Sequence, residues 1–86
     1  MPGVSRKDKD SAGGTIAAGS PNVFVDGAAA VRVGDAVTPH GTGAHASPKM
    51  AKGSSTVFVN GIAVCRAGDS ASCGHEASGS GDVFAG

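Results

Sequence analysis

The sequence predicts a small all-β fold made of repeated hairpins, and three observations favour it. Among 86 residues there are 15 Gly and 4 Pro, two residue types that destabilise the interior of a helix. Val-Phe-Val runs recur, and 7 basic residues balance 7 acidic ones, a pattern untypical of disordered chains. One segment of the chain also occurs twice. We therefore expect a single folded domain over residues 1–86.

The internal repeat relates residues 19–37 to residues 53–71, with 10 identities in 19 aligned positions. In each copy a Val-Phe-Val run precedes Asp26-Gly27 or Asn60-Gly61, dipeptides typical of the type I′ turn of a β-hairpin. Second strands are expected over residues 29–33 and 63–67. Both then end in Arg-x-Gly-Asp, so each copy is predicted to be a hairpin followed by a loop.

A third copy is divided between the two ends of the chain. Residues 79–86 repeat the first half of the unit, and residues 4–7 resemble the end of a second strand. After that strand, Asp8 and Lys9 stand where the other copies have Gly and Asp. If the two halves pair, the termini lie together and three equivalent units close around a pseudo-threefold axis. Two unrelated hairpins with loose ends are the alternative.

All the histidines of the chain, and one of its two cysteines, fall in the loops after the two complete Arg-x-Gly-Asp sequences. The predicted pseudosymmetry brings these loops to one end of the molecule. Nitrogen and thiolate ligands in this number suit a tetrahedral structural zinc ion, with iron as an alternative. The candidate ligands are His40, His45, Cys73 and His75.

The other cysteine, Cys65, aligns with Val31 on a second strand, where a thiol behaves as a small apolar group. We interpret Cys65 as a core residue, and a Cys65–Cys73 disulfide as the lesser alternative. Arg32 and Arg66 also align, and a shared structural role is expected, such as fixing the aspartate or carbonyl groups of a neighbouring unit, with an interaction role as the lesser alternative.

Composition limits the function classes. With three Phe and no Trp or Tyr, the chain has few large apolar side chains to bury. We therefore expect additional stabilisation, for example by a metal ion. A balanced charge gives no field that would attract nucleic acid or an anionic membrane, and Arg6, Lys7 and Lys9 alternate with Asp8 and Asp10 on an expected solvated face. No stretch has the length of a membrane span, and none has the form of a signal peptide. Synthesis in the cytosol is therefore expected.

The hairpins ending in small-residue-Arg-x-Gly-Asp, together with loop His and Cys residues, resemble the PAAR-repeat proteins over nearly the whole chain. The naming motif Pro-Ala-Ala-Arg is matched loosely, without Pro, by residues 29–32 (Ala-Ala-Val-Arg) and 63–66 (Ala-Val-Cys-Arg). Residues 13–16 (Gly-Gly-Thr-Ile), leading into Gly19-Ser20-Pro21, are similar to the amino-terminal segment of that family.

This resemblance implies a conical β protein whose triangular base sits on the trimeric VgrG spike of a type VI secretion system. Phage tail spikes carry related tips, so a phage or phage-like tail is the alternative setting. The family's zinc lies near the point and is bound by three His and one Cys, here His40, His45, His75 and Cys73. One copy, monomeric in isolation, would cap one trimer and be secreted or delivered into target cells with it.

The resemblance also implies that effectors travel with the tip. Because the sequence ends at Gly86, inside the third repeat, an effector is expected to bind non-covalently. The base would bind the spike through strand addition and apolar contact. The side chains available for that contact are Val23, Phe24, Val25, Val57, Phe58, Val59, Val83 and Phe84, of which alternation sends some into the core instead.

Two other function classes stay open. A zinc hydrolase would hold the metal by three histidines and a water, but Cys73 supplies a fourth ligand and no H-E-x-x-H sequence is present. In such a hydrolase, Glu76 would be the candidate general base. A zinc module for nucleic acid needs a basic face, which the composition lacks. A structural, non-enzymatic role is expected.

Overall fold

The computed structural model describes all 86 residues, Met1–Gly86, and confirms the all-β class. No helix in it has both the length and the apolar character that crossing a bilayer requires. Three two-stranded sheets and one short 3-10 helix are joined by extended chain and isolated bridges. The elements are β1 (Ser11–Ala12), β2 (Gly14–Thr15), β3 (Phe24–Val25), β4 (Ala28–Ala29), η1 (Gly43–His45), β5 (Phe58–Val59) and β6 (Ile62–Ala63).

The two complete hairpins form where the repeat predicts them. Phe24 pairs with Ala29 in β3-β4, and Phe58 pairs with Ala63 in β5-β6. Their turns have positive φ at both central positions, 53° and 79° at Asp26-Gly27 and 55° and 76° at Asn60-Gly61. This is the backbone that Asp-Gly and Asn-Gly favour in a type I′ turn.

The second strands are shorter than predicted. β4 ends at Ala29 and β6 at Ala63, whereas strands through residues 33 and 67 were expected. The chain leaves its own hairpin at this point because it pairs with a neighbouring unit. Bridges join Arg6 to Ala30, Arg32 to Val64 and Val4 to Arg66.

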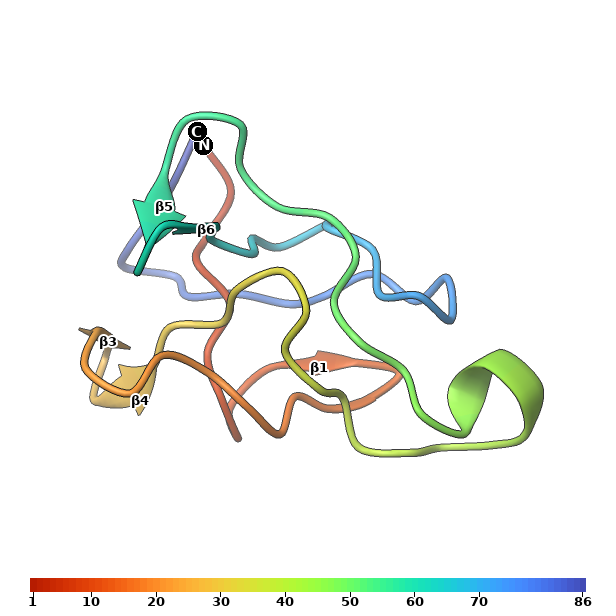
Figure 1. Cartoon of the computed structure of the whole chain (residues 1–86). Coiled ribbons are helices and arrows are strands. Elements are labelled where there is room, and N and C mark those ends of the chain that lie inside the picture. Colours follow the sequence, from red (N-terminus) through yellow and green to blue (C-terminus); the bar gives the residue numbers. More distant parts are fainter.

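The third hairpin is assembled from the two ends of the chain, as predicted. Gly3 and Phe84 form an antiparallel bridge. The amide of Val4 donates to the carbonyl oxygen of Val83 at 2.8 Å. The amide of Ala85 donates to the carbonyl oxygen of Pro2 at 3.0 Å. Figure 1 accordingly shows the termini side by side at the end of the molecule that holds both complete hairpins.

Three inner strand segments close into a ring about the axis. The amide of Ser5 donates to the carbonyl of Cys65 at 3.0 Å, Cys65 donates to Val31 at 2.8 Å, and Val31 donates to Ser5 at 3.0 Å. All three residues are fully buried. Because each hydrogen bond joins two different units, the ring leaves no inner strand edge unpaired.

Each unit turns away from this ring through the same Arg-Asp contact. Asp35 accepts the amide of Arg32 at 2.7 Å, and Asp69 accepts the amide of Arg66 at 2.8 Å. Both guanidinium groups also reach a carbonyl, Arg32 that of Gly19 and Arg66 that of Gly53. The two arginines therefore share a structural role, as predicted, but these aspartates and carbonyls belong to the arginine's own unit and not to a neighbouring one.

In the divided third unit the Arg-Asp contact survives although Gly-Asp is missing from the sequence. Asp8 adopts a φ of 64°, which takes the place of Gly34 and Gly68 at 93° and 91°. One extra residue, Lys9, then shifts the acceptor to Asp10, whose carboxylate accepts the amide of Arg6 at 2.8 Å. Aspartate tolerates the left-handed region better than most residues, which explains how the turn forms without glycine.

Small apolar side chains fill two layers of the interior, as the composition predicts. The layer near the hairpins comprises Val4, Val25, Ala30, Val59, Val64 and Ala85. The layer near the loops comprises Ala12, Ile16, Val31, Val37, Met50, Cys65, Ala71 and Ala77. With principal extents of 32 × 23 × 23 Å, the molecule is elongated and has two equal short axes, as threefold symmetry requires.

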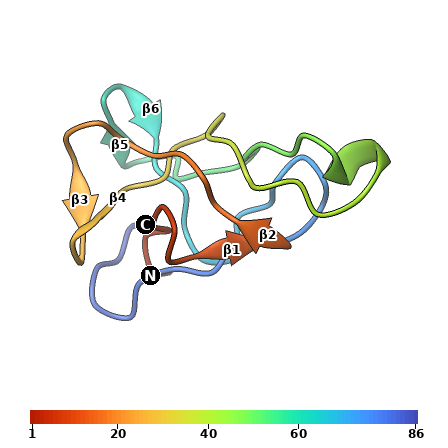
Figure 2. The same ribbon diagram turned by 90° about the horizontal axis from the view of Figure 1, so that it is seen from below.

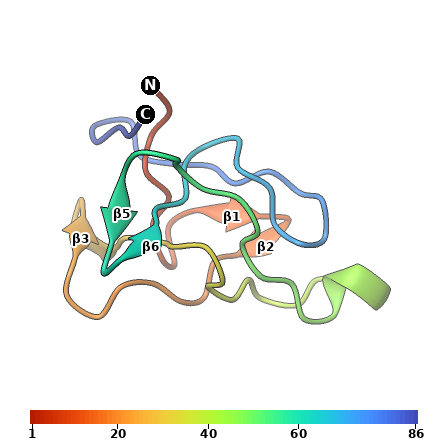
Figure 3. The ribbon, with the colours of Figure 1, turned by 45° about the horizontal axis from the view of Figure 1, so that its top comes forward.

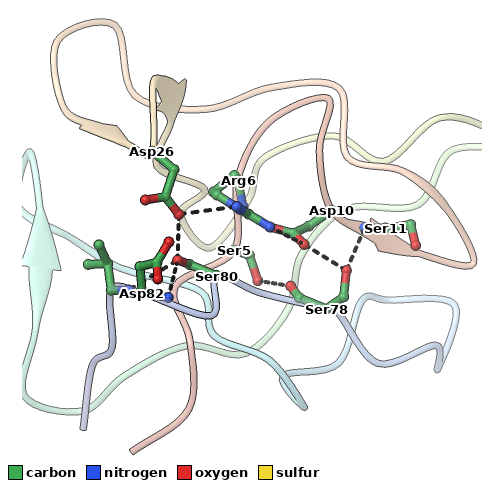
Figure 4. Close-up of polar contacts among 9 residues, drawn as sticks. Ser5, Arg6, Asp10, Ser11, Asp26, Ser78, Ser80 and Asp82 are labelled. Atoms are coloured by element: carbon green, nitrogen blue, oxygen red, sulfur yellow. Dashed lines mark hydrogen bonds and ion pairs between the residues drawn. The ribbon is translucent and has the colours of Figure 1, made fainter.

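Serine hydroxyls join neighbouring units at the hairpin end. Ser20 donates to Asn60 Oδ1 at 2.6 Å, and Ser80 donates to Asp26 Oδ2. Ser54 donates to the carbonyl of Gly86, which occupies the turn position of the third unit. Figure 4 shows one seam, where Asp26 accepts from both Ser80 and Arg6. Each unit thus contacts the next through a repeated polar group.

We predict that Asp10→Asn destabilises the fold by about 2 kcal/mol at neutral pH, because Asp10 is 4% exposed and accepts charged hydrogen bonds from Arg6. Burial alone would raise the pKa of Asp10, but hydrogen bonds from Arg6 and Ser78 outweigh it and lower the pKa. The stabilisation is therefore complete above the unfolded-state pKa of about 3.9 and is lost as the pH falls through the folded-state value.

Chemical unfolding from pH 7 to pH 2 measures this difference. The gap in unfolding free energy between the wild type and Asp10→Asn should shrink below about pH 4. Asp8→Asn is the matched control, because Asp8 is exposed and forms no ion pair. An equal gap at every pH would contradict the role given to the Asp10 carboxylate.

Candidate metal centre

Three loops leave the Arg-Asp turns toward the end opposite the hairpins. Residues 11–15, 36–49 and 70–76 each begin after the aspartate and end at an equivalent core residue. These end residues are Ile16, Met50 and Ala77. Their amides donate to the backbone carbonyl oxygens of Asp10, Asp35 and Asp69 respectively. Figures 2 and 3 show η1, within the longest loop, far from β3 and β5. The loops share their endpoints and differ in length, so the threefold symmetry is lost here.

The predicted ligands converge. One donor atom from each of His40, His45, Cys73 and His75 lies within 4.8 Å of all the others. The centroids of the three imidazole rings are 5.0, 5.1 and 5.2 Å apart, so the rings form a nearly equilateral triangle. His40, His45 and Cys73 are half-buried and His75 is exposed. Loops 36–49 and 70–76 supply two ligands each.

A backbone carbonyl orients the His40 ring. Nδ1 of His40 lies 3.0 Å from the carbonyl oxygen of Thr38, which can only accept, so Nδ1 carries the proton. The lone pair of Nε2 then faces the cluster, where Nδ1 of His45 lies 3.1 Å away. Metal-binding histidines in proteins usually donate their second nitrogen to an acceptor in this way.

The donor set fits a tetrahedral ion. Zinc to nitrogen bonds of about 2.0–2.1 Å place two nitrogen ligands about 3.3 Å apart, close to the 3.1 Å between His40 and His45. The widest separation in the cluster, 4.8 Å, requires a contraction of about 1 Å on binding. Three imidazoles and one thiolate fill four positions and suit zinc better than hard cations, which prefer oxygen.

The two cysteines have different environments. Cys65 is fully buried, and its thiol donates to the carbonyl of Lys52 at 3.2 Å. Burial, then the charges of Asp69 and Asp35, raise the pKa of the Cys65 thiol to about 12, so it stays neutral. Cys73 is half-buried, and both thiols are free. Cys65 is therefore a core residue, as predicted, and the alternative disulfide does not form.

At the opposite end, the structure divides the residues predicted to bind a partner. Val25 and Val59 are buried at 7% and 9% exposure and fill the interior. The remaining six are exposed, with 61%, 58% and 49% for Phe24, Phe58 and Phe84. Val23, Val57 and Val83 are the other exposed members.

Sequence reasoning did not single out the exposed apolar side chain of Ile62 near this face. Ile62 is 39% exposed beside the Asn60-Gly61 turn. Its counterpart in the first unit is Ala28, so the comparison of repeats gave no signal for it.

The fold and the cluster define a class: a pseudo-threefold β protein with hairpins at one end and, at the other, a set of His and Cys residues able to hold a metal ion. The PAAR motif family model matches residues 6–85, nearly the whole sequence. The chain belongs to the PAAR-motif family. Members are structural tip proteins that associate with the spikes of contractile injection systems, and membership supports such a role here. No curated protein sequence matches the chain significantly.

We predict that iodoacetamide labels the folded, metal-free protein at Cys73 alone, because Cys65 is buried and its pKa of about 12 leaves little thiolate at pH 8. Stoichiometric zinc should protect Cys73. Mass spectrometry of peptides after timed labelling measures both. Comparable labelling of Cys65, or labelling of Cys73 that zinc leaves unchanged, would contradict these assignments.

Metal analysis tests the full ligand set. We expect one zinc per chain in the wild type and a loss of about 10-fold or more in affinity for His40→Ala, His45→Ala, Cys73→Ser or His75→Ala. Glu76→Gln, adjacent to a ligand but exposed, should retain full occupancy. X-ray absorption should show three nitrogens and one sulfur. An oxygen ligand in place of the sulfur would instead favour the hydrolase alternative.

Proposed function

We propose that this chain is the zinc-stabilised tip of a contractile injection system, and that one copy caps a trimeric VgrG-like spike. The observation that carries this proposal is the set of exposed apolar side chains at the hairpin end. Phe24, Phe58 and Phe84 occupy equivalent positions in the three units, and each follows an exposed valine. Exposed apolar groups gathered in this way are typical of an interaction face.

Symmetry supports a trimeric partner. Three copies of the same Val-Phe pair, arranged about one axis, can each meet one chain of a threefold spike. One such face then binds three identical chains with three similar contacts, which gives one tip per trimer. The hairpins also offer short backbone edges for strand addition, since β3-β4 and β5-β6 are isolated two-stranded sheets.

A zinc ion at the candidate centre would stabilise the loops at the narrow end of the tip. The longest loop, residues 36–49, contains no strand and only the three-residue η1. A structural zinc ion contributes apparent binding free energy of about 10–16 kcal/mol, which exceeds the stability of many small domains. Zinc held by His40, His45, Cys73 and His75 would fasten two loops at the end that meets the target envelope.

The proposed function also implies where the protein is made and how it leaves the cell. It is made in the cytosol of the producing cell and leaves with the spike, and an effector travels with it. A spike of a phage or phage-like tail presents the same threefold surface, so that alternative shares the same base.

We predict a complex of one chain with one spike trimer, measured by native mass spectrometry. Phe24→Ser, Phe58→Ser and Phe84→Ser should each weaken it by about tenfold, with similar effects because the positions are equivalent. Lys49→Ser, an exposed change on the loop that ends near the tip, should leave binding unchanged. Spikes from a type VI system and from a phage-like tail are tested in parallel.

The outcomes separate the alternatives. Binding to one spike class alone assigns the system. An effect confined to a single phenylalanine would contradict threefold docking, and failure to bind the cognate spike would overturn the capping function.

A further inference from the structure

The first loop supplies no ligand but lies against the ligand cluster. β1 and β2 pair tightly, Ser11 with Thr15 and Ala12 with Gly14, and Gly13 forms the turn with a φ of 85°. Figures 1 and 2 show this small hairpin beside the two loops that carry the histidines and Cys73. The short loop therefore extends just far enough to reach the cluster.

Its backbone contacts the candidate ligands directly. A Cβ atom added at Gly13 would lie 2.3 Å from Cδ2 of His75 and 2.7 Å from Nε2 of His40. At Gly14 it would lie 2.9 Å from Nδ1 of His40 and 2.4 Å from the carbonyl oxygen of Thr38. Real Cβ atoms do not approach other atoms this closely, so any side chain here displaces the rings or the carbonyl.

The same backbone also approaches the thiol. The carbonyl oxygen of Ala12 is 3.9 Å from Sγ of Cys73. Residues 12–14 thus contact three of the four candidate ligands, His40, Cys73 and His75. Other glycines with positive φ differ in this respect, since a Cβ at Gly34 or Gly68 would meet nothing within 4 Å. Gly13 is needed for space as well as for φ.

We propose that Gly13 and Gly14 are positioning residues of the metal centre, and that the ligand-free loop closes one side of the cluster with bare backbone. This inference rests on the metal site of the proposed function. Gly13 allows His40 and His75 to approach each other, and Gly14 allows the Thr38 carbonyl to hold the proton-bearing Nδ1 of His40. On the side that this backbone covers, no space is left for a further ligand. Covering this side favours four-coordinate ions such as zinc over ions that prefer six ligands.

Metal titration of three variants tests the proposal. We expect Gly13→Ala and Gly14→Ala to weaken zinc binding by about 10–100-fold, the usual effect of disturbing groups that orient metal ligands. Gly34→Ala is the matched control, because its φ of 93° imposes the same backbone strain in open space. Its zinc affinity should equal that of the wild type. Gly14→Ala carries no left-handed strain, so it separates the contact from the backbone conformation.

The spectrum of the cobalt-substituted protein provides a second readout. The wild type and Gly34→Ala should show four-coordinate cobalt, and Gly13→Ala should lose that spectrum because its side chain displaces the rings of His40 and His75. Equal losses in Gly13→Ala and Gly34→Ala would overturn the proposal, since strain alone would explain them. Wild-type affinity and spectrum in both Gly13→Ala and Gly14→Ala would overturn it while leaving the metal site intact. Failure of the wild type to bind zinc or cobalt would overturn the metal site and this inference together.

Discussion

The structure depends on three backbone hydrogen bonds that join Ser5, Val31 and Cys65 into a closed ring. Each bond links two units, so none of the three units completes its pairing alone. These contacts join parts of the chain far apart in sequence, and the third unit exists only when the two ends of the chain meet. Cooperative folding of all three units follows from this ring, because opening one bond exposes the buried edges of two units.

On either side of the ring, one end of the molecule keeps the threefold symmetry and the other loses it. Toward the hairpins the contacts repeat: Ser20, Ser54 and Ser80 each donate to the turn of another unit. Toward the loops the repetition stops at the aspartates, since the following segments differ in length. The symmetrical end presents similar apolar groups three times, and the unsymmetrical end gathers a single cluster. The symmetrical end is therefore suited to a threefold partner, and the unsymmetrical end to a single ion.

The hairpins and the divided third unit could be predicted because the repeated sequence specifies them. Asp26-Gly27 and Asn60-Gly61 specify their turns locally, and the match of residues 79–86 to the earlier copies revealed the split third unit. Strand lengths could not be predicted, because Ala30 and Val64 pair with other units, which local pattern does not encode. The substitute contact of Asp10 was also hidden, since one inserted residue moves the aspartate out of register. Gly13 gave no sign of its contacts, which arise only when distant loops meet.

A metal centre of the proposed kind would explain why the loop end does not keep the symmetry of the hairpin end. Four ligands cannot be divided equally among three units, so identical loops would supply three or six donors and never four. Loops of unequal length solve this problem: residues 36–49 supply two ligands, residues 70–76 supply two, and residues 11–15 supply none. The unit without ligands is also the one whose loop is short and rich in glycine, as contact with the rings requires. Divergence of the loops and conservation of the base pattern within one chain are thus two consequences of the same threefold plan.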